Sequence, residues 1–238
     1  VVLVPTKDLQ YWKPKQMNFT LHSCDFESYS LGEQIGFAWQ LYTLRADLVH
    51  FCMPQQPLLF FGRKVTTVHD LTLIKTYSSD KNWLAYHVKQ TVGKAVIWLI
   101  PRTSRFVITD ADFTVNEYAK YASVDKRKFS RIYLAAETSK EIARKFDLPS
   151  KKYLLYVGQQ SDYKNIRRLI KAHQLLVKVY PDLNLVLVGS LNKSVRSNKT
   201  WVEKNNYVNV IFTGFVTDSQ LAWLYKNSAA YVFPSLME

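Results

Sequence analysis

The sequence predicts an α/β protein built from two doubly wound parallel sheets with helices on both faces. Short apolar runs alternate with longer amphipathic segments along the whole chain, a pattern typical of parallel sheets covered by helices. At 154–189, two continuous apolar runs enclose a helical pattern, as expected of a buried strand–helix–strand unit. A short polar stretch with a proline at 149–152 has the composition of a linker. We therefore expect one domain over 1–148 and a second over 153–238.

The first domain is predicted from runs bounded by turn residues. The expected strands are 1–4, 19–23, 48–51, 64–68, 105–109 and 129–133, and the expected helices are 31–44, 82–100, 114–121 and 139–146. We expect Pro101 to end the second of these helices, because proline has no backbone N–H and clashes with the preceding turn.

The helix at 83–100 is long enough to approach the thickness of a bilayer. His87, Lys89, Gln90 and Lys94 interrupt it, so a transmembrane helix is disfavoured. A helix packed on the sheet is the favoured interpretation, and an interfacial helix at a lipid surface is the alternative.

The second domain follows the same alternation. The expected strands are 154–157, 183–188, 209–212 and 230–233, with helices opening at Lys164–Asn165 and covering 195–204 and 218–226. Gly158 ends the first strand, and a polar turn leads into the first helix. Helix amino termini at the carboxyl edge of such sheets bind phosphates. A lysine in the first helical turn is unfavourable for the helix itself, and a bound phosphate explains its presence.

Composition suits a folded protein with an anionic partner. The 238 residues are 47% hydrophobic and carry a net charge of +13. Residues 1–150 contribute 20 − 14 = +6, and residues 151–238 contribute 12 − 5 = +7. No basic run with interleaved aromatic residues and no zinc pattern is present, so nucleic acid is the weaker interpretation. Cys24 and Cys52 have no metal-ligand spacing, and we expect both to be reduced.

Several ordered motifs in the second half carry a family resemblance. They are YVG, the KN pair followed by LIKAH, PDLNLVLVG, FTGFV, and LAWLYKNSAAYVFPS before a terminal glutamate. Together they resemble retaining glycosyltransferases of family 4. The first half resembles the family more loosely, through DLVHF, VTTVHDLTLI and FVITDADFTVNEYAKY. The resemblance implies the GT-B fold, two Rossmann-like domains facing each other across a cleft, and a nucleotide-diphosphate sugar as donor.

The resemblance places the donor diphosphate at Gly158, Gln159 and Lys164. A fixed cation stabilises the departing diphosphate more than the ground state, which suits Lys164. A solvated surface lysine is the alternative. Gln159 occupies a position where many relatives have arginine, so it can donate a hydrogen bond but supplies no charge. Arg167 or Arg168 could compensate, or both could be exposed helix cations.

Further donor contacts are expected near the end of the chain. In the family, a glutamate after the FPS motif contacts sugar hydroxyls, and this position is Glu238. Ser235 precedes it in the same motif. Gly214 and Phe215, in FTGFV, resemble a loop near the base, although a plain turn glycine beside a core aromatic fits equally well.

His69 is the candidate from the first domain. It ends a buried strand at the edge where a ligand cleft forms, and in the family a histidine at such a position contacts the transferred sugar. A histidine satisfied in the core is the alternative. Asp70 could orient it, cap the following turn or contact the acceptor. Thr109 and Asp110 end a neighbouring strand and are weaker candidates for the same cleft.

No metal-binding motif appears, which agrees with the metal-independent chemistry that the resemblance implies, and we expect no cofactor. The expected acceptor is a glycan or lipid-linked hydroxyl, at the cytoplasmic face of an anionic membrane or in the cytoplasm. The chain reads as a fragment truncated at both ends, and we expect it to be inactive by itself. A nucleotide-sugar epimerase, a phosphorylase, and a basic nucleic-acid- or membrane-binding protein remain open as alternatives.

Overall fold

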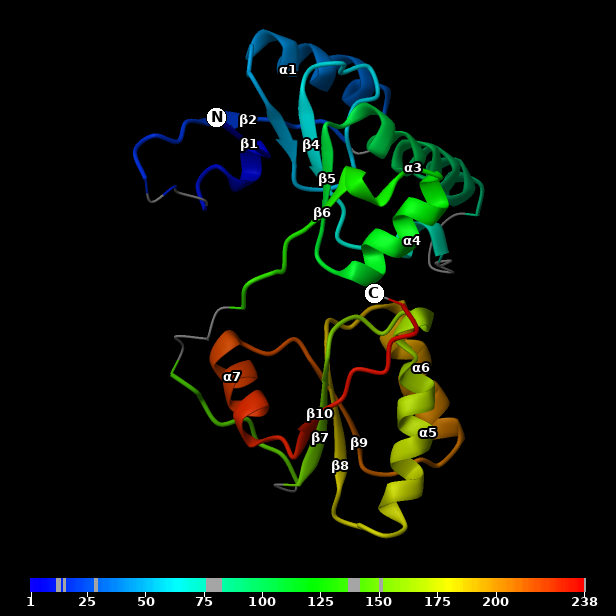
Figure 1. Cartoon of the computed structure of the whole chain (residues 1–238). Coiled ribbons are helices and arrows are strands. Elements are labelled where there is room, and N and C mark those ends of the chain that lie inside the picture. Colours follow the sequence, from blue (N-terminus) through cyan, green and yellow to red (C-terminus); the bar gives the residue numbers. More distant parts are fainter. Residues whose placement is uncertain are drawn as a thin grey trace. The chain divides into compact units, whose positions relative to one another are not determined.

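The computed structural model describes residues 1–11, 14, 16–27, 30–75, 83–136, 142–149 and 152–237. The chain forms two compact units (Figure 1). Val1–Lys75 and Trp83–Leu134 make the first unit, and the second begins at Ala135. Phe146 and Leu148 precede the predicted linker at 149–152, yet both pack against the core of the second unit.

The first unit contains a four-stranded parallel sheet in the order β3-β4-β5-β6. Its strands are β3 (Val49–Phe51), β4 (Lys64–Thr67), β5 (Phe106–Thr109) and β6 (Phe129–Arg131). A separate parallel pair joins β1 (Val2–Val4) to β2 (Leu21–Ser23). All strand pairs are parallel, as the sequence predicts.

Helices connect these strands. They are the π-helical turn η2 (Glu33–Phe37), α1 (Ala38–Thr43), α2 (Thr72–Lys75), α3 (Trp83–Thr103) and α4 (Asp112–Ala122), with short 3-10 turns η1 (Thr6–Asp8) and η3 (Lys126–Lys128). Val96, Ile97 and Ile100 of α3 are buried, so this part of the helix packs against the protein. Among the described residues, no helix combines the length and the apolarity that a bilayer crossing requires.

The prediction that Pro101 ends the long helix is wrong, because α3 continues to Thr103. Proline cannot donate the hydrogen bond that the Ile97 carbonyl would receive in a regular helix. The Tyr118 hydroxyl of α4 donates to that carbonyl instead, at 2.6 Å. Tyr118 is fully buried, and burial raises the pKa of its hydroxyl well above the usual range. A contact distant in sequence therefore satisfies the group that proline leaves open.

Tyr118→Phe is expected to destabilise the protein by about 1–3 kcal/mol, because it strands the buried Ile97 carbonyl without a donor. Tyr121→Phe is the matched control. Its hydroxyl donates to the Lys94 carbonyl at 3.1 Å, and that carbonyl can also receive an intrahelical N–H. Urea unfolding of both variants measures the difference, and equal losses would contradict the role given to Tyr118.

The helix predicted over 139–146 is wrong for its described part, since residues 142–146 are not helical. Residues 139–141 lie outside the described residues. Phe146 of this segment packs against the core of the second unit, and the Arg144 amide donates to the Ser219 carbonyl at 3.0 Å. These contacts with another element replace the local hydrogen bonds of a helix.

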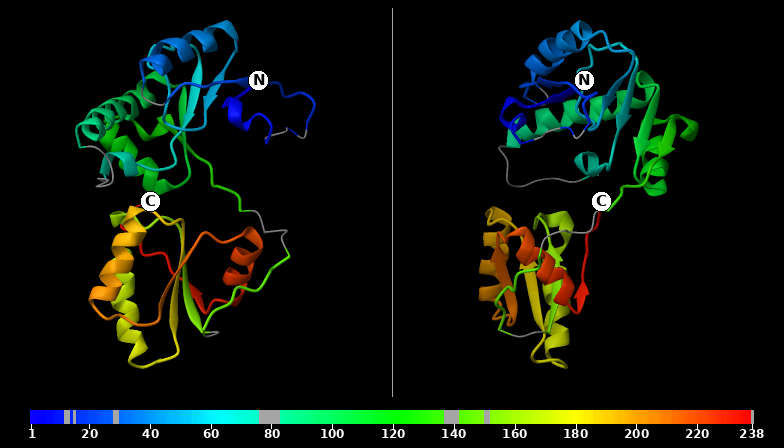
Figure 2. Two further views of the ribbon diagram at one scale, coloured as in Figure 1. Left: turned by 180° about the vertical axis from the view of Figure 1, so that it is seen from behind. Right: turned by 90° about the vertical axis from the view of Figure 1, so that its left-hand side faces the viewer.

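The second unit has a parallel sheet in the order β10-β7-β8-β9. Its strands are β7 (Tyr153–Val157), β8 (Asn184–Val188), β9 (Val210–Gly214) and β10 (Ala230–Tyr231). Helices α5 (Ile166–Val177) and α6 (Lys193–Lys204) cover one face, and α7 (Asp218–Asn227) covers the other (Figures 1 and 2). This is the doubly wound arrangement that the sequence predicts.

Alternation along the strands builds a core on each face of this sheet. Leu185 and Leu187 of β8 pack with Ile170 of α5 on one face. Val186 and Val188 pack with residues of α7 on the other, among them Leu224. Because β8 is buried on both faces, its continuous apolar run is the pattern expected of a central parallel strand.

Candidate functional site

The loop after β7 forms the centre of the candidate site in the second unit. Gly158 has a φ of 141°, a backbone conformation that side chains disfavour. Its amide donates to the Val188 carbonyl at 2.9 Å, which extends the pairing of β7 with β8. Gln159 follows and is exposed, and its carbonyl accepts a hydrogen bond from Tyr156 Oη at 2.5 Å. The loop is thus held at the carboxyl edge of the sheet, with the Gln159 side chain in solvent.

Two further glycines lie at the same edge. A Cβ on Gly189, directly after β8, would lie 2.4 Å from the Gly158 carbonyl oxygen, so only glycine fits there. The Gly189 amide reaches the Gly214 carbonyl at 3.3 Å, and Gly214 itself has a φ of 72°. Three strands therefore end in closely spaced glycine backbones. Gly189 was not among the predicted site residues, although its place at the end of an apolar run is the signal that identifies it.

Lys164 lies beside this edge, in the 3-10 turn η4 (Asp162–Lys164) that leads into α5. Its Nζ lies 4.9 Å from the ring centre of Tyr163 and 4.9 Å from that of Phe233. The side chain is half-buried. Aromatic faces attract a cation without neutralising it. The two rings therefore hold the ammonium group in a defined place, next to a helix start without a side-chain cap.

The FPS motif runs alongside the Lys164 turn. Asn165 adopts a left-handed conformation and donates from Nδ2 to the Pro234 carbonyl at 3.1 Å. The Leu236 amide donates to the Tyr163 carbonyl at 2.8 Å. Ser235 Oγ is buried and has no hydrogen-bond partner among the described residues. Two motifs far apart in sequence thus meet at one turn, while Glu238 lies outside the described residues.

The two arginines considered as substitutes for a cation at Gln159 lie elsewhere. Arg167 donates from Nε to Asn198 Oδ1 at 3.1 Å and from Nη2 to Ser197 at 3.0 Å, so it binds α6. Asn198 Nδ2 in turn donates to Gln160 Oε1 at 3.1 Å. Arg168 lies on the exposed side of α5. The hydrogen bonds of Asn198 with Arg167 and with the buried Gln160 tie the loop after Gly158 to α6, a connection that the sequence did not predict.

Phe215 follows the positive-φ Gly214 and is 82% exposed. Phe215 is therefore not a core aromatic residue. An exposed ring at the carboxyl edge of the sheet can stack on a planar ligand.

In the first unit, His69 pairs with Asp110. The Asp110 Oδ2 lies 2.7 Å from His69 Nδ1, and the two residues follow the adjacent strands β4 and β5. An ionised carboxylate only accepts hydrogen bonds, so it favours the tautomer that carries the proton on Nδ1. This leaves Nε2 of a neutral imidazole as an acceptor. The His69 side chain is 40% exposed, so it is not a fully buried core histidine.

The neighbours of His69 have other roles. Asp70 Oδ1 accepts a hydrogen bond from the Thr72 amide at 2.7 Å and so caps the start of α2. Thr109 is fully buried, and its Oγ1 has no hydrogen-bond partner among the described residues. The residue that orients His69 is therefore Asp110, which the sequence had favoured less than Asp70.

Within the described ranges, no cluster of three or more His, Cys, Asp or Glu side chains is placed to hold a metal ion. Cys24 and Cys52 are both free thiols.

Comparison with known proteins finds a family match in the second unit. Residues 138–238 match the family described as Glycosyl transferases group 1. The match covers most of the second unit and none of the first. The glycine-edged sheet, the Lys164 turn and the FPS segment all lie within the matched range.

Two curated proteins to which this chain is similar are mannosyltransferases of Escherichia coli. O-antigen chain mannosyltransferase B is 23% identical over 227 residues, which cover 89% of this chain and 57% of the relative. Serotype-specific mannosyltransferase WbdA is 26% identical over 189 residues, covering 74% of this chain and 23% of the relative. The chain thus spans little more than half the length of the first relative.

Solved structures show the same fold. WaaG, a glycosyltransferase involved in lipopolysaccharide biosynthesis, is similar with a TM-score of 0.58 at 16% identity, over 91% of this chain and 62% of WaaG. The pneumococcal O-GlcNAc transferase GtfA, solved with UDP and GlcNAc, has a TM-score of 0.57 at 18% identity, over 86% of this chain and 41% of GtfA. These similarities confirm the predicted α/β class with Rossmann-like units of the GT-B type.

Proposed function

We propose that the protein is a retaining glycosyltransferase of family 4 that transfers mannose from a nucleotide-diphosphate sugar to a hydroxyl of a growing glycan. The family match carries this proposal, because the matched range contains the Lys164 turn and the glycine edge. The names of the two mannosyltransferase relatives support mannose as the sugar and an O-antigen-type glycan as the acceptor.

In the proposed reaction, the donor diphosphate binds at the Gly158 edge, with its charge facing Lys164. Cleavage of the sugar–phosphate bond increases the negative charge on the leaving diphosphate, and a fixed cation stabilises that change. The acceptor hydroxyl forms its bond on the face that the diphosphate vacates, so the anomeric configuration is retained. Protein cations and helix amides take the place that a metal ion has in other sugar transferases, and no cofactor is required.

Donor selection and stereochemistry test this proposal in the intact protein. A panel of nucleotide-diphosphate sugars is offered with a mannan-type acceptor, and the product linkage is read by NMR. We expect transfer of mannose with retention, and unchanged rates in EDTA. Inversion at the anomeric carbon, or donor turnover without acceptor, would contradict the proposal.

We further propose that His69 contacts the substrate and that Asp110 orients it. Asp110→Asn is expected to lower kcat about tenfold to a hundredfold, because an amide no longer fixes the Nδ1 proton and one charge-assisted hydrogen bond is lost. Steady-state kinetics measure the change. Asp112→Asn is the matched control, since Asp112 pairs with Arg131 at 2.7 Å in the same unit and is more than half exposed. A similar loss in both variants would remove Asp110 from the mechanism.

The acceptor and the location of the protein complete the proposal. A glycan that grows on a lipid carrier would place the enzyme in the cytoplasm, at or near the membrane face. The positive net charge supports such a place, because anionic leaflets attract basic surfaces.

A further inference from the structure

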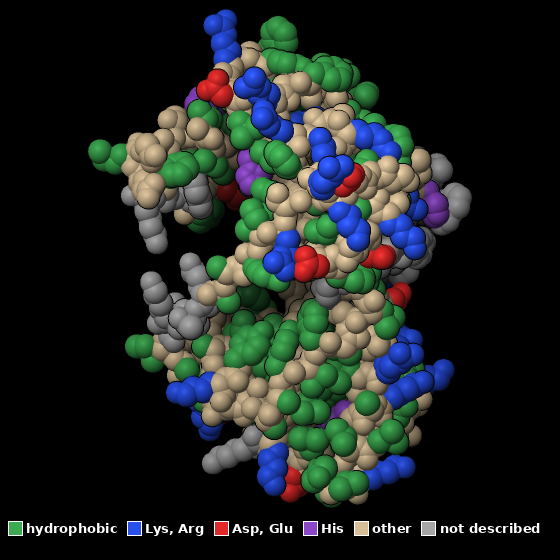
Figure 3. Space-filling model, viewed as in Figure 1, with side chains coloured by type: hydrophobic (Ala, Val, Ile, Leu, Met, Phe, Trp, Pro, Cys, Tyr) green, Lys and Arg blue, Asp and Glu red, His purple; other side chains and the backbone are tan. Residues whose placement is uncertain are grey.

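The helical layer formed by α5 and α6 concentrates the positive charge of the second unit. α5 carries three lysine or arginine residues and no acid, and α6 carries four with one acid, Glu203. All seven cations are exposed. Figure 3 shows Lys and Arg side chains along the side of the second unit where Figure 1 places these two helices. α7, on the opposite face, carries one cation and one acid.

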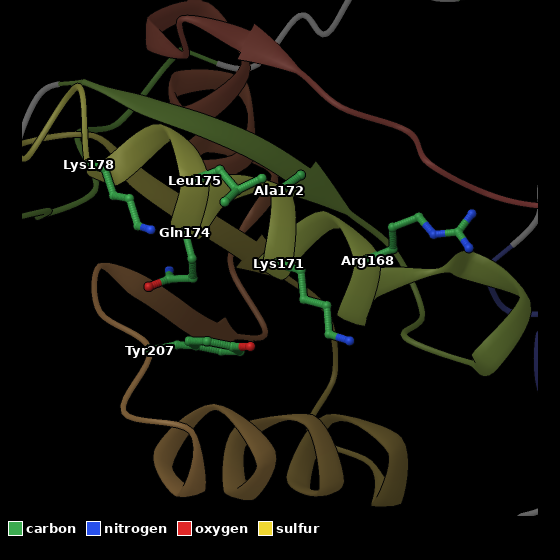
Figure 4. Close-up of a pocket in the computed structure, with 7 residues that line it drawn as sticks. All are labelled: Arg168, Lys171, Ala172, Gln174, Leu175, Lys178 and Tyr207. Carbon is green, nitrogen blue, oxygen red and sulfur yellow. The ribbon is translucent and has the colours of Figure 1, made fainter.

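A groove lies between α5 and the segment that follows α6. It has a volume of about 530 Å³ and is lined by Arg168, Lys171, Leu175, Lys178 and Tyr207, with Ala172 and Gln174. Figure 4 shows Lys171, Gln174 and Lys178 extending from α5 to the side where Tyr207 lies. We call this surface the basic groove. Its walls combine apolar side chains and lysine stems with charged ends, which is how long cations cover an apolar surface.

Exposed apolar side chains continue this surface at the far end of α5. Leu175 is 66% exposed, Val179 68% and Tyr180 60%. The Gln174 side chain forms hydrogen bonds with both the amide and the carbonyl of Val208, which holds Val208 beside them. Val208 is 53% exposed. Aliphatic and aromatic groups with flanking lysines are the composition of a lipid-interface surface.

The position of this end of α5 is compatible with sugar transfer. α5 starts at the carboxyl edge of the sheet, next to Lys164, and its twelve residues extend roughly 18 Å along the sheet. The exposed apolar end therefore lies at the opposite edge of the sheet from Gly158, Gly189 and Gly214. A surface bound there would leave the proposed donor site open.

We propose that the α5–α6 face docks on an anionic phospholipid bilayer through the basic groove. This inference rests on the proposed function, because docking would serve to keep the enzyme near a lipid-linked acceptor. Charge complementarity selects an anionic partner. Lysine, which provides five of the eight cations on α5, α6 and position 178, is depleted at protein–protein interfaces but suits lipid head groups. The exposed aliphatic groups have no counterpart on a nucleic-acid backbone, whereas a bilayer interface accepts them.

Vesicle flotation of the intact protein tests the proposal. The probes are vesicles of phosphatidylglycerol with phosphatidylcholine, and vesicles of phosphatidylcholine alone. We expect binding to the first only, weakened by high salt. Lys171→Gln with Lys178→Gln should lower the partition coefficient by about fivefold for each cation removed. Leu175→Ser with Val179→Ser should lower the binding that persists in high salt.

Lys145→Gln with Lys226→Gln is the matched control. It removes the same charge from exposed positions of the second unit outside the α5–α6 face, and Lys226 lies on α7. We expect this pair to bind as the unchanged protein does. An equal loss in both pairs would show that net charge alone acts and would overturn the proposed surface. Absence of binding to anionic vesicles, or binding of an acidic protein or nucleic acid in their place, would overturn the assignment of a bilayer as the partner of this surface.

Sugar transfer to a soluble acceptor, without vesicles, separates this proposal from the proposed function. The Lys171 and Lys178 variant should transfer at the unchanged rate. Sugar transfer without vesicle binding would refute only the proposed docking surface. Vesicle binding without sugar transfer would refute only the proposed glycosyltransferase function.

Discussion

Replacing Lys164 by methionine is expected to lower kcat/KM for sugar transfer by about 10²–10³-fold, the usual effect of removing one electrostatic contact to developing charge. Methionine keeps the length and the packing between the Tyr163 and Phe233 rings but removes the charge. Steady-state kinetics on the intact protein measure the loss. Most of it should appear in kcat, because the diphosphate gains charge as the bond breaks.

Lys164→Arg is the companion variant and should retain much of the activity, because it restores a cation at the same turn. Melting temperatures of both variants show whether the turn still folds. Equal activity of the methionine variant and the unchanged protein, with both folded, would remove Lys164 from the mechanism.

Gly189→Ala is expected to destabilise the second unit by about 1–3 kcal/mol and to abolish donor binding. The new Cβ would lie 2.4 Å from the Gly158 carbonyl oxygen, a backbone atom that cannot move without separating the loops after β7 and β8. Thermal unfolding measures the stability, and titration with a nucleoside diphosphate measures the affinity.

Gly32→Ala is the matched control in the first unit. Gly32 has an ordinary helical φ of −58°, and its Cβ would meet the nearest atom at 3.4 Å, so a methyl group fits. This variant should keep full stability and donor affinity. An alanine at 189 that behaved like the one at 32 would show that the glycine edge is not closely packed.

The fold was predictable because its signals are local. The strands β7 and β8 contain continuous apolar runs, and α5 carries apolar residues at helical spacing. The errors arose where distant contacts decide the structure. Pro101 continues a helix because Tyr118, on another helix, donates to the buried carbonyl of Ile97, which lacks its helical donor. The non-helical course of residues 142–146 depends on Ser219 and on a core built by later strands.

The candidate site was predictable in its outline but not in its pairings. The sequence placed Gly158 and Lys164 after a strand, and the structure places both at the carboxyl edge of the sheet. It did not reveal that Asp110 pairs with His69, because adjacency in a parallel sheet joins residues far apart in the chain. One of the two rings beside Lys164 likewise belongs to Phe233, which lies next to the turn only once the sheet has folded.

Backbone amide NMR of the intact protein, titrated with a nucleoside diphosphate, tests the central assignment most directly. We expect the amides of Gly158, Gly189 and Gly214 and of the Lys164 turn to shift together and saturate, while those of the basic groove stay unchanged. Shifts confined to the cations of α5 and α6, with the glycine amides unaffected, would contradict that assignment.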